Sequence, residues 1–220
     1  KPYDGIQIDF ELIPGRDADN FISFLKELSD LSKKQEKVFS VCVPARVKTI
    51  SDDVFPYKKI GDLADKVIVM AYDEHWSTSK PGAIASFKWC QRIVDYSVTV
   101  IPQEKLVMGL PFYGRTWSDK KPAQAWYYSG INRIMKENNA KKVEYIEGIP
   151  SVKFNMEVEV TGFFEDVNSV VQKMRLYNFK NVKNIAFWRI GQEDSDVWDW
   201  IKINDETANL EESKETTETK

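Results

Sequence analysis

The chain has 220 residues, enough for one domain or for one domain with an insertion. A hydrophobic fraction of 42%, a charged fraction of 30% and a formal net charge of −3 are typical of an ordinary globular domain. The charge gives no reason to expect a nucleic-acid partner, and no apolar run is long enough to span a membrane, so we expect neither kind of partner.

The metal-binding residue types are scarce. Cys42 and Cys90 fall in apolar segments, which favours buried core thiols over a disulfide or a metal site. His75 is the single histidine of the chain and cannot complete a metal centre with them. We therefore expect no metal and no cofactor.

The first expected strand carries two acidic side chains on one face. From Ile6 onward apolar and polar residues alternate, which is the period of a β-strand and places Gln7, Asp9 and Glu11 together. Carboxylates at positions i and i+2 of a strand lie roughly 6–7 Å apart at their Cα atoms. Like charges at that distance disfavour joint ionisation, which suits a general acid. A solvated strand face is the alternative, and periodicity alone leaves both open.

Strands and helices alternate along most of the chain, which predicts βα units and a parallel sheet. Further strands are expected over 37–43, 67–71, 106–110 and 184–189. Helices are expected after a cap at Asp17 or Asp19 and over 57–64, 85–98, 167–176 and 194–203.

Helical spacing of apolar residues predicts the buried faces of three helices. The residues expected to face inward are Phe21, Phe24, Leu25, Leu28 and Leu31 in the first helix, Phe87, Cys90, Ile93 and Val94 in the one over 85–98, and Val170, Val171 and Met174 in the one over 167–176.

The βα rhythm breaks between about 118 and 162. A helix is expected over 130–138, followed by two alternating runs, 142–147 and 152–160, around a Gly/Pro turn. This pattern predicts an antiparallel hairpin with one buried face, hence a subdomain excursion. Residues 204–220 hold Asp, Glu, Thr and Lys with almost nothing apolar, so we expect a disordered acidic tail after a domain spanning 1–203.

Polar and aromatic side chains collect just after the expected strands. They are Glu11, Tyr72, Asp73, Tyr113, Arg115 and Arg189. The carboxyl ends of the strands form the catalytic face of a (β/α)₈ barrel. The pattern therefore favours an active site at these strand ends.

Four segments resemble one enzyme family in family order. The segment Asp4–Glu11, DGIQIDFE, is similar to the fourth-strand signature D-x-x-D-x-D-x-E of family-18 glycoside hydrolases, with Gln7 in place of the second Asp. VIVMAYD, ending at Asp73, resembles the family's M-x-Y-D strand, GLPFYGR its seventh strand, and IAFW, ending at Trp188, its last strand. The similarity runs from Tyr3 to about Trp200.

The resemblance implies an α/β fold, a (β/α)₈ TIM barrel of which strands four to eight are present. It also implies a small α+β insertion, about 118–162, between strands seven and eight. A closed barrel needs eight strands and typically about 250 residues. We therefore expect a fragment of a longer protein, inactive on its own and prone to aggregate at its unpaired edges.

The resemblance also implies roles for particular residues. Glu11 would protonate the leaving glycosidic oxygen, Asp9 would hold the sugar's 2-acetamido group for attack on the anomeric carbon, and Tyr72 would donate a hydrogen bond to the acetamido oxygen. Trp188 would form the floor of the sugar subsite. Further substrate contacts are expected from Gln7, Asp73, Tyr113 and Arg115. Glu74, His75 and Trp76 form a polar and aromatic loop beside them.

Two functions remain open on the sequence. One is a glycosidase that cleaves β-linked N-acetylglucosamine polymers, and retention of Glu11 favours it. The other is a lectin, since barrels of this family that lack the catalytic Glu bind glycans without cutting them. MAYDEHW and the stretch from FFED to FWRIG look most like the branch acting on peptidoglycan and spore cortex, whereas chitin and N-glycan cores stay possible substrates. The resemblance implies a secreted or cell-wall-associated protein.

Overall fold

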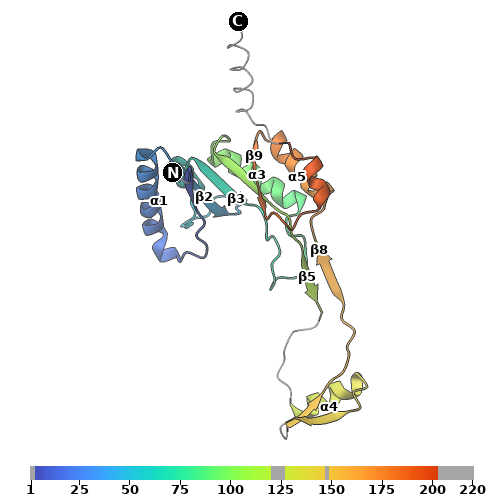
Figure 1. The fold of residues 1–220 in the computed structure, drawn as a ribbon. Coiled ribbons are helices and arrows are strands. Elements are labelled where there is room, and N and C mark those ends of the chain that lie inside the picture. Colours follow the sequence, from blue (N-terminus) through green and yellow to red (C-terminus); the bar gives the residue numbers. More distant parts are fainter. Residues whose placement is uncertain (1–2, 120–126, 147–148, 203–220) are drawn as a thin grey trace.

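A five-stranded parallel sheet organises the chain in the computed structural model, which describes residues 3–119, 127–146 and 149–202 (Figure 1). Its strands are β1 (Gly5–Ile8), β2 (Val38–Pro44), β3 (Lys66–Met70), β4 (Leu106–Pro111) and β9 (Asn184–Trp188). Their order in the sheet is β1-β2-β3-β4-β9, with every neighbouring pair parallel. The predicted parallel α/β architecture is confirmed, and β1 and β9 form the two edges of this sheet.

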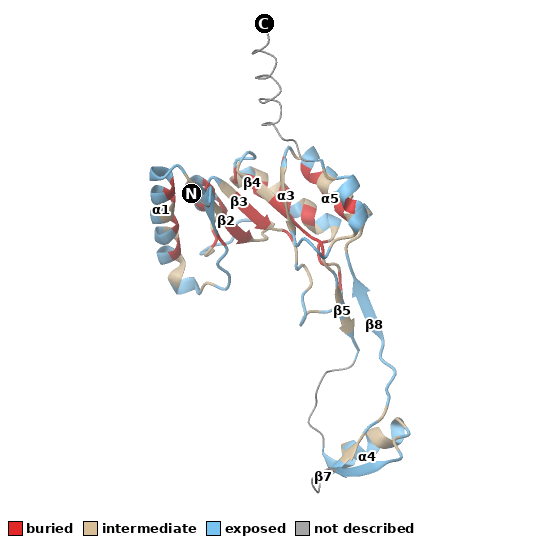
Figure 2. Cartoon of the chain, viewed as in Figure 1, coloured by how far each residue is buried: buried red, intermediate tan, exposed pale blue. Residues whose placement is uncertain are grey.

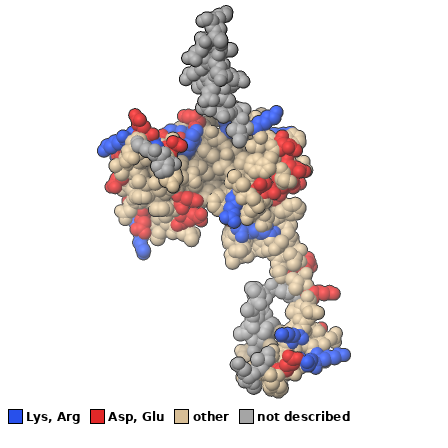
Figure 3. All heavy atoms as spheres, viewed as in Figure 1, with Lys and Arg blue, Asp and Glu red and all other residues tan. Residues whose placement is uncertain are grey.

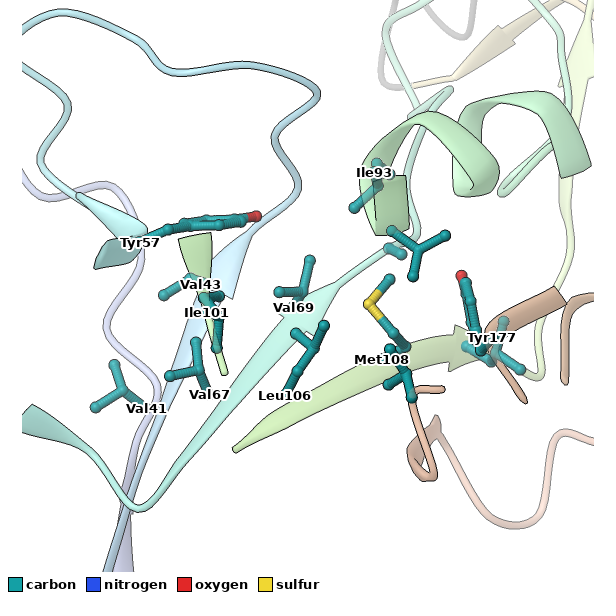
Figure 4. Close-up of a cluster of buried hydrophobic side chains, with 14 of the residues drawn as sticks. Val41, Val43, Tyr57, Val67, Val69, Ile93, Ile101, Leu106, Met108 and Tyr177 are labelled. Atoms are coloured by element: carbon teal, nitrogen blue, oxygen red, sulfur yellow. The ribbon is translucent and has the colours of Figure 1, made fainter. Parts of the chain in front are cut away.

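Helices pack on one side of the sheet. They are α1 (Ala18–Lys34, after the short 3₁₀ turn η1, Gly15–Asp17), α2 (Tyr57–Leu63), α3 (Phe87–Val100) and α5 (Val167–Phe179). Figure 2 shows buried residues in the central strands and on the inward sides of the helices. Alternate residues of the strands supply the core, among them Val41, Val43, Val67, Val69, Leu106 and Met108, which Figure 4 shows beside Ile93 and Tyr177 from the helices. Cys42 and Cys90 are free buried thiols, as predicted.

The inward faces of the helices differ in part from the prediction. Phe21 and Leu25 are buried, but Phe24 and Leu31 are exposed, and Ser29 and Ser32 are buried in their place. The Ser29 hydroxyl donates to the Leu63 carbonyl at 2.7 Å, so a polar contact with α2 sets this part of the α1 face. Hydrophobicity alone cannot detect such a contact.

The other two faces agree better with the prediction. In α3, Cys90, Ile93 and Val94 are buried, whereas Phe87, the first residue of the helix, is exposed. In α5, Val170 is buried, and Val171 and Met174 are partly buried.

The excursion projects from the sheet on a pair of short strands (Figure 1). Strands β5 (Arg115–Ser118) and β8 (Val160–Phe163) pair antiparallel, and beyond them lie α4 (Tyr128–Glu137) and the hairpin of β6 (Val143–Ile146) and β7 (Ile149–Val152). The predicted hairpin was wrong in its second strand, because the alternating run 153–159 is irregular and Met156 and Val158 in it are exposed. Alternation indicates extended backbone, but the partner strand decides where a ladder forms. The expected bounds of the excursion, about 118–162, stay a prediction.

The chain after β9 is less helical than predicted. In place of a helix over 194–203, the described part holds the 3₁₀ turn η2 (Ser195–Asp199), which Asp194 caps by accepting from the Asp196 amide at 3.2 Å. The predicted tail, 204–220, lies outside the described residues. No described helix is long and apolar enough to cross a membrane. Acidic and basic side chains are interspersed over the face that Figure 3 shows.

A buried ion pair fixes the start of α5. The ammonium of Lys173 contacts Oε2 of Glu165, and the two side chains are only 4% and 6% exposed. The Ser169 hydroxyl donates to the same carboxylate oxygen at 2.6 Å, and Asp166 caps the helix by accepting from the Ser169 amide at 2.8 Å. Each charge is therefore partnered inside the protein, where an unpartnered one would be costly.

We predict that Lys173→Met in the whole protein lowers the free energy of unfolding by about 3–5 kcal/mol, because it leaves the Glu165 carboxylate buried without its cation. Urea unfolding measures this loss. Lys26→Met is the matched control, since Lys26 pairs with Asp30 on the exposed face of α1. Equal midpoints for the two variants would contradict the prediction.

Candidate active site

A cavity of about 400 Å³ lies at the carboxyl ends of the parallel strands. The residues that line it are Asp9, Glu11, Met70, Tyr72, Asp73, Tyr113, Gly114, Arg115, Trp188, Arg189 and Gln192. The lining thus includes seven of the eight site residues singled out in the sequence. It brings together residues 9 and 192, which come from the two opposite edges of the sheet.

The eighth, Gln7, lies elsewhere. It sits within β1, where Ser40 Oγ donates to its Oε1 at 3.3 Å, and it is not part of the cavity lining. Strand β1 ends at Ile8, so Gln7 is inside the strand whereas Asp9 and Glu11 follow it. The expected substrate contact of Gln7 is therefore not supported by its position.

Phe10 directs the two carboxylates toward the cavity. Its ring stacks on Phe24 of α1, with centroids 5.6 Å apart and planes 7° apart, and on Phe21 at 6.4 Å. Asp9 and Glu11 line the cavity while Phe10, between them, packs on the helix, so the acids and the aromatic ring point to different sides of this segment. The aromatic residue between two acids thus positions both.

Tyr72 is partly buried in the cavity wall. Burial raises the pKa of its phenol, and the negative charges of Asp9, Glu11 and Asp73 raise it further. Gly109 of β4 makes room for this ring, because a Cβ atom there would lie 3.0 Å from Cε1 of Tyr72. Tyr72 therefore remains a hydrogen-bond donor across the physiological pH range.

Cys42 underlies the same region. The register of β1 and β2, which pairs Ile8 with Val41, places Cys42 next to Asp9 across the two strands. Burial raises the pKa of the Cys42 thiol to about 12, with the Asp9 carboxylate as the second cause. The thiol is thus protonated and unreactive at neutral pH.

Asp73 connects two other side chains of the cavity wall. Its Oδ1 accepts from the Tyr113 hydroxyl at 2.5 Å and from Arg115 Nη2 at 2.8 Å and Nε at 3.3 Å. The Arg115 guanidinium also lies over the Tyr113 ring, 5.5 Å from its centroid. Burial raises the pKa of Tyr113, and its hydrogen bond to the Asp73 carboxylate raises it further. Asp73 and Arg115 therefore form an ion pair within the cavity wall.

Trp188 provides an apolar platform at the end of β9. It pairs with Pro111 of β4, its carbonyl accepts from the Phe112 amide at 2.7 Å, and the residue is 51% exposed. An aromatic face that is fixed by the backbone and open on one side suits stacking against a sugar ring.

The loop after Asp73 is braced internally. The Glu74 carboxylate accepts from the Ser86 amide at 2.8 Å, and His75 Nδ1 lies 2.9 Å from the Ala83 carbonyl. Trp76 is exposed, and its carbonyl accepts from Trp117 Nε1 at 3.2 Å. None of these three loop residues lines the cavity, so their expected role in substrate contact stays a prediction.

Four lining residues were given no catalytic or substrate-binding role from the sequence, although Arg189 was named among the polar residues at the strand ends. Arg189 had a signal, since it directly follows the last strand, and Met70 ends β3. Gly114 carried none beyond its place between Tyr113 and Arg115. Gln192 had none, because it reaches the cavity through a turn at Gly191, whose φ of 90° suits glycine. Within the described ranges, no group of three or more His, Cys, Asp or Glu side chains is arranged to hold a metal ion.

The parallel sheet with helices on one side is a TIM-barrel-like α/β fold. The acidic, phenolic and indole side chains at the carboxyl ends of its strands form a site suited to glycans. The family model of glycosyl hydrolases family 18 matches residues 1–193. The chain belongs to glycosyl hydrolases family 18, as its four motifs predicted.

Similar proteins agree with this assignment. The chain is 28% identical over 210 residues to an uncharacterized glycosylase, YvbX, of Bacillus subtilis, covering 91% of the chain and 61% of the relative. It is 26% identical over 216 residues to the cortical fragment-lytic enzyme of Bacillus subtilis, covering 91% of the chain and 49% of the relative. The chain thus spans about half to three fifths of the length of these relatives.

Solved structures share the fold. The spore cortex-lytic enzyme SleL of Bacillus cereus superimposes with a TM-score of 0.68 at 22% identity, over 89% of this chain and 48% of that one. The putative sporulation-specific glycosylase ydhD of Bacillus subtilis gives 0.65 at 26% identity, over 85% and 66%.

We predict that Asp73→Asn lowers the pKa of Tyr113, because the substitution removes the negative charge of the carboxylate that accepts a hydrogen bond from the Tyr113 hydroxyl. Ultraviolet difference titration of tyrosinate, compared with the unsubstituted protein, measures the shift. The double variant Asp73→Asn with Tyr113→Phe is the control and should lack the shifted component. Identical titration curves for Asp73→Asn and the unsubstituted protein would contradict the arrangement.

Proposed function

We propose that the protein hydrolyses β-linked N-acetylglucosamine polymers, with peptidoglycan favoured over chitin, by a substrate-assisted reaction that retains the anomeric configuration. The observation that carries the proposal is the juxtaposition of Glu11, Asp9 and Tyr72 on one cavity, with Trp188 as its platform. The names of the relatives, which include cortical fragment-lytic enzymes, support peptidoglycan as the polymer.

The first step breaks the glycosidic bond. The carbonyl oxygen of the sugar's own acetamido group attacks the anomeric carbon, while Glu11 gives its proton to the departing glycosidic oxygen. Asp9 orients the acetamido group by accepting from its N–H, and the phenol of Tyr72 donates to its oxygen. The raised pKa of Tyr72 supports this assignment, because only the protonated phenol can donate.

The second step returns the enzyme to its starting state. The Glu11 carboxylate takes a proton from a water molecule as the water attacks the anomeric carbon and opens the cyclic intermediate. Two displacements on one carbon retain its configuration, and the net reactant is one water molecule. Asp73, Tyr113 and Arg115 would hold the sugar hydroxyl groups from the cavity wall. Gln7 receives no substrate contact in this scheme, since it does not line the cavity.

The five strands would correspond to strands four to eight of a complete barrel, with β5 to β8 as the insertion that walls the substrate groove. The exposed edges of β1 and β9 and the greater length of the relatives support this correspondence. The action on a cell-wall polymer implies that the whole protein works outside the cytoplasm.

We predict that Glu11→Gln in the whole protein lowers kcat on N-acetylglucosamine oligomers by about 10²–10⁴-fold, because the amide cannot transfer the proton. The dissociation constant of the same oligomers should change little, since the amide is nearly isosteric. The control is Glu27→Gln, on the exposed face of α1. Unsubstituted protein that binds the oligomers without cleaving them would contradict the proposal and indicate a lectin.

A further inference from the structure

The charges that line the cavity are divided between its two sides. Asp9 and Glu11 come from the segment after β1, and Arg189 comes from the segment after β9, at the opposite edge of the sheet. A ligand that fills the cavity would therefore have the carboxylates of the protein on one side and a guanidinium on the other.

The two lining arginines differ in their partners. Arg115 is paired with Asp73, as described above, and its charge is compensated within the protein. Within the described part of the chain, no acidic side chain forms an ion pair or hydrogen bond with the guanidinium of Arg189. Arg189 is thus the lining cation whose charge is available to a ligand.

Glu193, the acidic residue nearest to Arg189 in the sequence, has other hydrogen-bond partners. Glu193 Oε2 accepts from the amides of Gly191 at 2.5 Å and Gln192 at 3.0 Å, and its Oε1 accepts from Trp198 Nε1 at 3.2 Å. These contacts stabilise the turn after β9 and leave Arg189 uncompensated beside Trp188.

Resting on the proposed function, we infer that Arg189 is a specificity-determining residue that binds the lactyl carboxylate of a muramyl sugar whose stem peptide has been removed. In peptidoglycan strands whose stem peptides have been removed, each N-acetylglucosamine has a muramyl neighbour that carries this acid on O3. With the stem peptide in place the lactyl group is an uncharged amide, and chitin has no carboxylate. Arg189 adjoins Trp188 in the sequence and lines the same cavity, and it comes from the opposite edge of the sheet to Asp9 and Glu11. An acid on the neighbour of a sugar stacked on Trp188 would be attracted to Arg189 and repelled by the two carboxylates. A guanidinium binds a carboxylate with two parallel hydrogen bonds, which sugar hydroxyl groups cannot match.

The expected preference is moderate. Arg189 is exposed, and ion pairs in contact with water are weakened by solvent and by salt. A charge-assisted bidentate contact at such a site should favour the acid over an uncharged analogue by about tenfold at low ionic strength.

The test compares two tetrasaccharides of alternating N-acetylglucosamine and N-acetylmuramic acid, one with free lactyl acids and one with lactyl amides. The readout is the ratio of kcat/KM for acid and amide, together with their dissociation constants in the Glu11→Gln background. In the whole protein we expect a ratio of about ten that shrinks in high salt. We expect a ratio near one for Arg189→Gln and an intermediate ratio for Arg189→Lys. Arg92→Gln, on the exposed side of α3, should keep the original ratio.

The outcomes separate this inference from the proposed function. Hydrolysis of acid and amide at equal rates, or an unchanged ratio in Arg189→Gln, contradicts the role of Arg189 and leaves the hydrolase intact. Arg189-dependent binding of the acid without cleavage of either tetrasaccharide supports the role of Arg189 and contradicts the proposed hydrolysis.

Discussion

The parallel pairing of β1, β2, β3, β4 and β9 is the constraint on which the site depends. Parallel strands present their carboxyl ends at one edge, so residues far apart in sequence reach the same cavity. Asp9 directly follows β1, Tyr72 comes two residues after β3, and Trp188 ends β9. The hydrophobic face under the helices fixes the register, since a slip by one residue would turn every side chain to the opposite face.

Aromatic contacts outside the cavity orient the side chains that this register brings to the ends of the strands. Phe10 is held on α1, so its two acidic neighbours turn toward the cavity, and the absence of a side chain on Gly109 leaves room for the ring of Tyr72. Burial then determines protonation, because it raises the pKa of Tyr72 and of Tyr113. The same packing that stabilises the sheet thus keeps two phenols available as donors beside carboxylates.

Much of the fold and most of the site follow from the sequence. Continuous apolar runs such as 67–71 predict buried strands because parallel strands are covered on both faces, and residues after those runs predict the cavity. The irregular segment 153–159 was missed because alternation does not identify a partner strand. The buried face of α1 was missed in part because Ser29 is buried through a hydrogen bond that apolar spacing cannot reveal. Gln192 reaches the cavity through the turn at Gly191, which has no periodic signal.

The central claim is that the acetamido group of the substrate, oriented by Asp9 and Tyr72, is the nucleophile. The direct measurement is kcat/KM of the whole protein for a pair of oligomers that differ only in N-acetylation of the sugar at the cleaved bond. The account predicts that removing this acetyl group lowers kcat/KM by at least about 10²-fold, since the proposed mechanism takes its nucleophile from the substrate and not from a protein side chain. Equal turnover of the two oligomers would contradict the account and require a nucleophile from the protein.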